Sequence, residues 1–92
     1  MKLRATSSAE RDLLAIGRYI SADSPQSAKR VVGRIMSAAT RLTDQPEMGR
    51  RGERDGTREW VVRGLPYVIV YRVSWEEDEI VLLNVFHGAR DR

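Results

Sequence analysis

Residues 57–73 have the sequence TREWVVRGLPYVIVYRV, and this stretch decides the fold. It contains two runs rich in β-branched and aromatic residues, the composition of strands that lie half-buried in a sheet. Gly64-Leu65-Pro66 separates the runs and is typical of a hairpin connection. Pro66 has no N–H group to donate to a neighbouring strand, so it belongs before the second strand or at its first residue. We therefore predict two antiparallel strands joined at this turn.

A third apolar run extends this hairpin into a sheet. Residues 80–86, IVLLNVF, follow the acidic turn EEDE at 76–79, and their composition again favours a strand. Because the connection is short, we expect this strand to pair with the second one in an antiparallel meander of three strands. The meander then ends in HGAR at residues 87–90.

The segment before the meander has the spacing of two helices. Ser7 and Glu10 match a capping box, and Ser24-Pro25 ends the first helix and begins the second, which continues to about Thr43. The first helix carries an apolar stripe of Ala9, Leu13, Ile16 and Ile20. The second helix has an apolar side of Ala28, Val31, Val32, Ile35, Ala38, Ala39 and Leu42, and a basic side of Lys29, Arg30, Arg34 and Arg41. We expect an antiparallel helical hairpin that covers one face of the sheet.

The remaining segments complete a single domain over residues 1–92. Residues 2–6 have the weak alternation of a short edge strand, and residues 44–56 have no periodicity, which predicts a loop. The predicted order is strand, helix, helix, strand, strand, strand. This is an α+β fold with a short N-terminal strand and a helical hairpin packed on a three-stranded antiparallel meander.

Composition excludes several kinds of chemistry. The chain has no Cys, which excludes disulfides, thiolate metal sites and a cysteine nucleophile, and its single His excludes a site with several histidine ligands. We expect no metal and no cofactor. No apolar run approaches the roughly 18 residues of a membrane span and no signal peptide is visible, so we expect a soluble, cytoplasmic protein with no membrane contact. The net charge of +3 suits a nucleic acid or an acidic protein partner.

Short motifs in a fixed order carry a resemblance to a known family. They are AERDL at 9–13, YI at 19–20, PEMGR at 46–50, GTRE at 56–59, PYVIVYRV at 66–73 and HGAR at 87–90. With the order of elements, they make nearly the whole chain similar to the RelE/ParE superfamily of bacterial toxins. The resemblance implies the toxin of a type II toxin–antitoxin system of the plasmid stabilisation kind. Such a toxin causes growth arrest and is neutralised by a cognate acidic antitoxin, ParD-like or similar, in a hetero-oligomer.

The superfamily implies two different targets. RelE-like members are ribosome-dependent, metal-independent mRNA endonucleases, whereas ParE-like members poison DNA gyrase without chemistry of their own. In the RelE-like branch, cations stand at the places that correspond to Glu59, Val61 and Val68, and none of these residues is basic. A tyrosine after the last strand is also missing. We therefore expect a ParE-like gyrase inhibitor that is not an enzyme.

Two other readings stay open. An mRNA endonuclease acting with the ribosome would use Arg58, Arg72, His87 and Arg90 as its catalytic residues, with Glu47 a weaker candidate base. A member that only binds an antitoxin is the third reading. His87 has the pKa range of a general acid or base, but a hydrogen bond that ties down the strand end is the interpretation we favour.

The expected partner-binding residues are a small set of cationic and aromatic side chains: Arg58, Arg72, Trp75, His87 and Arg90. Arg58 and Arg72 either converge on one face to hold carboxylates or are surface arginines, with Glu59 available as a cross-strand partner. Trp75 adjoins the acidic turn and is expected to be an exposed anchor for a partner. The other strand aromatics, Trp60, Tyr67 and Tyr71, are expected in the core.

Overall fold

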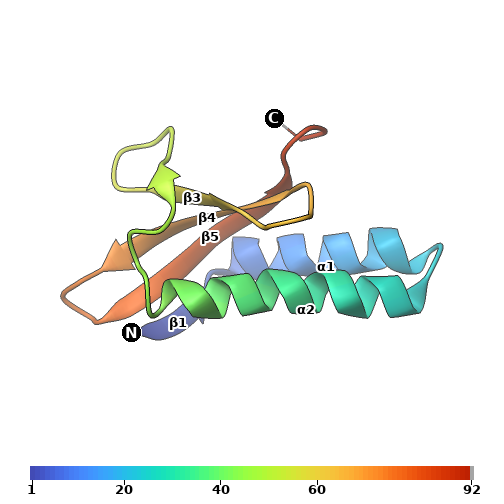
Figure 1. Ribbon diagram of the computed structural model, residues 1–92, viewed down its shortest axis with the longest axis horizontal. Coiled ribbons are helices and arrows are strands. Elements are labelled where there is room, and N and C mark those ends of the chain that lie inside the picture. Colours follow the sequence, from blue (N-terminus) through green and yellow to red (C-terminus); the bar gives the residue numbers. More distant parts are fainter. Residues whose placement is uncertain (92) are drawn as a thin grey trace.

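The computed structural model describes residues 1–91 and places two helices on one face of a five-stranded sheet (Figure 1). In chain order the elements are β1 (Lys2–Ala5), α1 (Ser7–Ser21), α2 (Pro25–Leu42), β2 (Arg50–Arg51), β3 (Arg58–Val61), β4 (Tyr67–Ser74) and β5 (Glu79–His87). The strand order is β1-β5-β4-β3-β2, with β1 parallel to β5 and the other neighbours antiparallel. The predicted α+β class, helical hairpin and antiparallel meander are confirmed.

The two edge strands differ in how well the sequence predicted them. The expected N-terminal strand is present as β1, which pairs with residues 79–82 of β5. Strand β2 lies inside the segment that we expected to be a loop, and it pairs Arg50 with Glu59 and Arg51 with Arg58. A strand of two residues is too short for the period-two alternation that marks longer strands, so its sequence carries no such signal.

Side chains at the helix ends explain where α1 and α2 begin. Thr6 is the N-cap of α1, because its backbone is extended and its hydroxyl accepts the N–H of Ala9 at 3.2 Å. The predicted capping box at Ser7 is therefore wrong by one residue. Ser24 caps α2 as predicted, accepting the N–H of Ser27 at 3.1 Å, and Pro25 occupies the first helical position. Both helices have a polar side, and within residues 1–91 neither has an apolar segment long enough to cross a bilayer.

The core lies between the helices and the inward face of the sheet. Tyr67, Ile69 and Tyr71 of β4 alternate toward the helices, while Val68 and Val70 occupy the opposite face. The buried core cluster consists of Ala9, Ile16, Ile35, Ala39, Leu42, Val62, Tyr67, Ile69, Tyr71, Ile80, Leu82 and Val85. The core positions expected for Tyr67 and Tyr71 are confirmed, and Trp60 packs against the cluster from its edge.

A β-bulge in β5 is held by polar side chains from the N-terminal part of the chain. The register between β4 and β5 shifts after Val70, so that Leu83 is the extra residue. Asp12 of α1 accepts the N–H of Val85 at 2.9 Å and the side-chain amide of Asn84 at 3.2 Å. The hydroxyl of Thr6 donates to the carbonyl oxygen of Leu83 at 3.1 Å. These bonds satisfy backbone groups at the sheet edge beyond β1 and fix α1 over β5.

Tyr71 fastens the segment after α2 to the sheet. Its buried hydroxyl donates to the carbonyl oxygen of Pro46 at 2.8 Å and accepts the N–H of Gly49 at 2.9 Å. Gly49 is required here, since a Cβ atom would stand 2.7 Å from both the Glu59 carbonyl oxygen and the Tyr71 hydroxyl. Burial raises the pKa of Tyr71 above its ordinary value of 10.0.

Truncation of Ile35 to Ala should test the core. Ile35 is 0% exposed, so Ile35→Ala removes buried methyl groups and leaves a cavity, with an expected loss of about 2–5 kcal/mol in the free energy of unfolding. Urea denaturation followed by far-UV circular dichroism measures it. Leu14, which is 59% exposed, supplies the control. Leu14→Ala should stay within about 0.5 kcal/mol of the wild type, and equal losses in the two variants would contradict this core.

Substitution of Tyr71 by Phe should change stability and its dependence on pH. At neutral pH we expect a loss of about 1–3 kcal/mol, because the Gly49 N–H and the Pro46 carbonyl lose their partner. Since the pKa is raised in the folded state, the contribution of Tyr71 is present below about pH 10 and is lost as the pH rises through the folded pKa.

Unfolding measured between about pH 8 and 12 should therefore show a fall in wild-type stability that is smaller in Tyr71→Phe. Tyr19 is exposed, so Tyr19→Phe is the matched control and should retain the wild-type pH dependence. An identical profile for Tyr71→Phe and wild type would show that the hydroxyl is not desolvated.

Candidate functional site

The predicted partner-binding residues lie at three separate places. Arg58 and Trp75 line one pocket at the end of the sheet near β2. His87 pairs with Tyr67 at the opposite end of β4, and Arg90 follows it. Arg58 is paired with Tyr71 in the sheet, so Arg72, the next residue, is on the opposite face. Of the two alternatives left open for Arg58 and Arg72, convergence on one face is therefore excluded.

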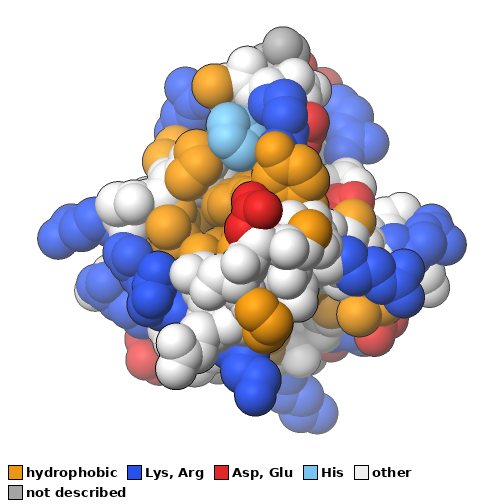
Figure 2. Space-filling view, turned by 90° about the vertical axis from the view of Figure 1, so that its right-hand side faces the viewer, with side chains coloured by type: hydrophobic (Ala, Val, Ile, Leu, Met, Phe, Trp, Pro, Cys, Tyr) orange, Lys and Arg blue, Asp and Glu red, His pale blue; other side chains and the backbone are white. Residues whose placement is uncertain are grey.

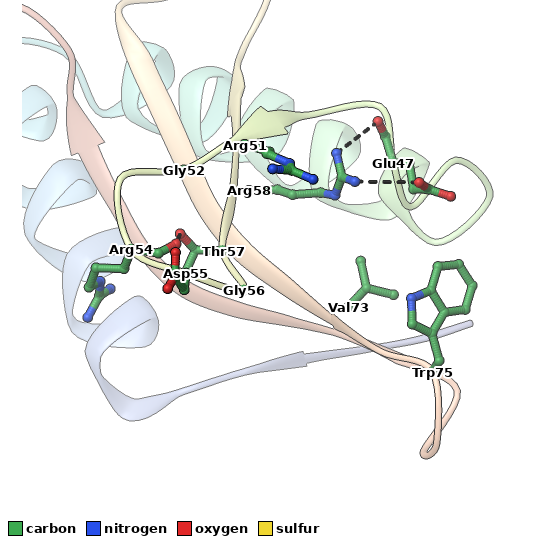
Figure 3. A pocket seen from close by; sticks show the side chains of 10 residues that line it. All are labelled: Glu47, Arg51, Gly52, Arg54, Asp55, Gly56, Thr57, Arg58, Val73 and Trp75. Atoms are coloured by element: carbon green, nitrogen blue, oxygen red, sulfur yellow. Dashed lines mark hydrogen bonds and ion pairs between the residues drawn. The ribbon is translucent and has the colours of Figure 1, made fainter.

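We call the first place the arginine pocket, defined by Glu47, Arg51, Arg54, Arg58, Val73 and Trp75. It has a volume of about 710 Å³ and lies between the 45–57 segment and the turn after β4. Figure 3 shows the side chains of Arg51 and Arg58 extending toward Glu47, with Val73 and Trp75 across the pocket. Trp75 is 63% exposed, which confirms that it is not a core residue.

Arg58 is held in place by the segment that Tyr71 anchors. Its guanidinium donates to the carbonyl oxygen of Gly49 at 2.7 Å and, at 3.4 Å, to both the carbonyl oxygen and the carboxylate of Glu47. The short bond from Arg58 goes to a backbone carbonyl, whereas its contact with the Glu47 carboxylate is long. The side chain of Glu47 is also 70% exposed. Arg58 is therefore positioned by the fold, and its charge is only weakly paired.

Strand β2 places two cations opposite each other on β3. Arg51 and Arg58 are direct cross-strand partners, and the side chain of Arg51 forms no hydrogen bond or ion pair with any residue in the described range 1–91. The next pair along is matched in charge, since Arg50 contacts the buried carboxylate of Glu59 at 3.1 Å. Glu59 was expected to pair with an arginine of the meander, but its partner comes from the unpredicted strand β2.

His87 and Arg90 form a turn that closes the end of β5. The ring nitrogen Nδ1 of His87 accepts the N–H of Arg90 at 3.0 Å, and the ring packs edge-on against Tyr67 at 5.5 Å. Asp91 accepts the N–H of His87 at 2.9 Å, and this bond lowers the pKa of Asp91. The guanidinium of Arg90 lies 4.6 Å from the centre of the Tyr19 ring. Figure 2 shows hydrophobic side chains beside the histidine at this end of the molecule, with basic side chains around them.

The face of the sheet away from the helices contains the positions where RelE-like enzymes carry cations. Val61 pairs with Val68, and Glu59 pairs with Val70, so these side chains share that face. A concavity of about 640 Å³ lies there. Among residues 1–91, its lining includes one basic residue, Arg54, and apolar groups of Val70 and Phe86. The acidic residues of the lining are Asp12, Glu53, Glu59 and Asp91. We call this surface the outer face.

A mainly apolar groove runs between the helices on the side away from the sheet. It has a volume of about 850 Å³ and is lined by residues of α1 from Glu10 to Ser21 and of α2 from Pro25 to Gly33. Small residues such as Gly17 and Ala28 form its floor, and Leu14 forms part of its wall. Val32, predicted on the core side of the second helix, lines this hairpin groove instead. Arg18 and Lys29 lie along it.

Sequence reasoning missed two residues of these surfaces. Arg51 was counted only as part of a loop, because its partner Arg58 becomes visible only when β2 is known to pair. Leu14 lies outside the predicted core stripe of the first helix. Its spacing of three residues from Gly17 was the sequence feature that could have placed both residues on a second, non-polar side of that helix. Among residues 1–91, no cluster of three His, Asp or Glu side chains is placed to hold a metal ion.

Comparison with known proteins gives consistent results. Residues 3–92 match the family described as the ParE toxin of the type II toxin–antitoxin system parDE. The chain is 42% identical to the protein Y4kP of Sinorhizobium fredii over 95% of this chain and 88% of that protein. It is 39% identical to Toxin RelE2 of Caulobacter vibrioides, over 86% of this chain and 85% of that toxin.

Solved structures agree with the sequence relatives. A chain of the chromosomal ParDE system from P. aeruginosa has a TM-score of 0.81 and 28% identity, with 95% of both chains covered. A chain of the RelBE2 toxin–antitoxin complex from Mycobacterium tuberculosis has a TM-score of 0.69 and 27% identity, with 94% of this chain and 95% of that chain covered. The topology of the sheet and hairpin is therefore that of the ParE/RelE toxins. The chain belongs to the ParE family of toxins of type II toxin–antitoxin systems.

Proposed function

We propose that this toxin acts as a ParE-like inhibitor of DNA gyrase, by binding and without cleaving RNA. The observation that carries the proposal is the character of the outer face. Glu59, Val61 and Val68 occupy the positions at which the resemblance to RelE-like enzymes would require cations, and their register puts all three on that one face. On this proposal the toxin acts in the cytoplasm, where its target is found.

Electrostatics argue against RNA cleavage on the outer face. A phosphodiester that is being cleaved accumulates negative charge, and enzymes stabilise it with cations or hydrogen-bond donors placed around the phosphorus. Here Arg50 is already paired with Glu59, and among residues 1–91 the lining of the concavity includes four carboxylates and one guanidinium. An RNA backbone on this surface would meet carboxylates where it needs cations.

His87 is also engaged in the fold. Its Nδ1 atom accepts the Arg90 N–H, so that nitrogen is used in a hydrogen bond that closes the turn. His87 lies opposite Tyr67 at the start of β4, whereas Arg58 lies opposite Tyr71, farther along that strand. The four residues of the nuclease reading, Arg58, Arg72, His87 and Arg90, are therefore not grouped around one space where a phosphate would sit.

The gyrase assignment can be tested directly with purified toxin. We expect inhibition of gyrase supercoiling, or accumulation of cleaved DNA–gyrase complexes, at toxin concentrations that give no new 5′ ends on mRNA with ribosomes. Primer extension measures the second activity. His87→Gln, which keeps an acceptor at the strand end, should retain gyrase inhibition. Codon-positioned mRNA cleavage by the wild type that disappears in His87→Gln would instead establish the ribonuclease alternative.

We further propose that the partner is a cognate acidic antitoxin that folds on the hairpin groove. The two solved relatives described above come from ParDE and RelBE toxin–antitoxin systems. An apolar trough with small floor residues suits an amphipathic helix, which would lay its apolar side into it. The basic residues Arg18 and Lys29 along the groove suit acidic side chains on that helix.

Antitoxin binding should raise the stability of the toxin and depend on the groove. The probe is the product of an acidic reading frame that adjoins the toxin gene. At a free concentration of 100 times Kd, a partner that binds only the folded toxin adds about 2.7 kcal/mol, which appears as a higher melting temperature. Leu14→Lys should weaken this complex, because it places a charge on the apolar wall of the groove.

Val61→Lys is the matched control for this experiment. Val61 is 54% exposed on the outer face, so the same change of residue type is made at similar exposure away from the groove. Both free variants should melt near the wild-type temperature. If Val61→Lys weakens the complex and Leu14→Lys does not, the antitoxin occupies the outer face.

A further inference from the structure

The arginine pocket contains a like-charge pair that the fold leaves unbalanced. Arg51 and Arg58 lie directly opposite each other on β2 and β3, an arrangement that destabilises a sheet. The adjacent pair, Arg50 with Glu59, shows that the same two strands also hold a matched pair. Of the two residue pairs between β2 and β3, only the pair that lines the pocket, Arg51 with Arg58, is therefore unfavourable.

The carboxylate that contacts Arg58 is loosely held, and a second one, Asp55, also lines the pocket. Glu47 contacts only Arg58, at 3.4 Å, and its side chain is 70% exposed, while Arg51 has no polar partner within residues 1–91. A fork of two guanidinium groups binds carboxylates well, because each presents several N–H donors in one plane. Glu47 thus occupies part of a site that a second carboxylate would fill more completely.

An apolar wall stands opposite the arginines. The exposed indole of Trp75 and the side chain of Val73 line the same pocket (Figure 3). A large exposed aromatic ring beside cations suits a ligand that carries an apolar group next to its negative charge. The pocket combines both requirements within about 710 Å³.

The turn beyond Trp75 restricts the class of ligand. Glu76, Glu77 and Asp78 are exposed carboxylates that follow Trp75 directly. A nucleic acid strand that stacked on Trp75 would bring its next phosphates toward this turn, where like charges repel. A protein segment avoids the conflict, because its charge can change sign from one residue to the next.

We propose that the arginine pocket binds a short protein segment in which one or two carboxylates adjoin an aromatic or aliphatic side chain. The carboxylates lie between Arg51 and Arg58, and the apolar side chain packs on Trp75. Basic residues that follow in the segment face the acidic turn. The pocket therefore recognises a short acidic and apolar motif, with two guanidinium groups on one side and an indole on the other.

The position of the pocket assigns this segment to the target and not to the antitoxin, an assignment that rests on the proposed function. The hairpin groove is lined by residues between Glu10 and Gly33 of the helical hairpin, and the arginine pocket lies toward the other end of the molecule, which is 41 Å long (Figure 1). The two sites share no lining residue. A helix seated in the groove leaves the pocket open.

The direct test is a titration of the full-length toxin with a blocked peptide that carries two aspartates beside a phenylalanine. NMR of the indole N–H of Trp75 reports binding. We expect a saturable shift, none with the same peptide carrying asparagines, and none with oligothymidylate. No shift with the acidic peptide at millimolar concentration overturns the proposal, and a shift with oligothymidylate alone assigns the pocket to nucleic acid.

Charge reversal at Arg51 separates binding from folding. Arg51→Glu creates an opposite-charge pair with Arg58, so the melting temperature should rise by about 1–8 °C while peptide affinity falls by at least about tenfold. Arg50→Gln is the matched control. It leaves the buried Glu59 without its Arg50 contact, so it should melt lower than the wild type and bind the peptide unchanged. Wild-type peptide affinity in Arg51→Glu would overturn the proposal.

A cellular assay tests the assignment to the target. Arg51→Glu should lose growth arrest at wild-type protein level and still form the antitoxin complex. Loss of the antitoxin complex with retained toxicity would overturn that assignment and give the pocket to the antitoxin. If the wild type proves to cleave mRNA, the proposed function fails, while the peptide titration still decides whether the pocket binds its motif.

Discussion

The hydroxyl of Tyr71 connects the core of this protein to its most polar surface. The ring fills the centre of the inward face of the sheet, and the hydroxyl bonds with Pro46 and Gly49 hold the segment that leaves α2. That segment in turn supplies the backbone carbonyl that orients Arg58, and it leads into β2, which carries Arg51. The arginine pocket therefore depends on a buried hydrogen-bonded side chain that never reaches its surface.

Separate surfaces of one small domain are available for separate partners. The hairpin groove is mainly apolar, the arginine pocket combines cations with an indole, and the outer face is acidic and apolar. Their different chemistry means that a single partner surface does not fit all three. Such a division suits a toxin, because its antitoxin and its target need not compete for the same atoms.

Much of the fold followed from periodicity, and the rest depended on register. The runs that became β3, β4 and β5 and the stripes of α1 and α2 were visible because each spans enough residues to show a period of 2 or 3.6. Strand β2 has only two residues, and only its pairing with β3 identifies it as a strand. The faces of Arg58 and Arg72 depend on the pairing across the hairpin, where a shift of one residue moves every side chain to the other face. Without that register, the sequence could not show that Arg58 and Arg72 lie on opposite faces of the sheet.

The same limit explains the site. The exposure of Trp75 followed from the acidic turn beside it, since such a turn is poorly placed in a core. The pairing of Arg51 with Arg58 depends on β2, which is too short to show a period in the sequence. The bond between Asp12 and Val85 at the bulge joins residues that are 73 positions apart, and a composition pattern contains no trace of such a contact.

The order of the strands also has a consequence for synthesis of the toxin. Strand β5, the last strand along the chain, lies between β1 and β4 in the sheet, so β1 has no partner until residues 79–82 have been made. Domains acquire their structure as units, and a sheet whose inner strand comes last is completed only after that strand leaves the ribosome. A chain interrupted before β5 has neither the support under α1 nor the bulge that Asp12 caps. Incomplete translation products therefore lack the strand that joins β1 to the rest of the sheet, and the fold is completed only once nearly all of the chain exists.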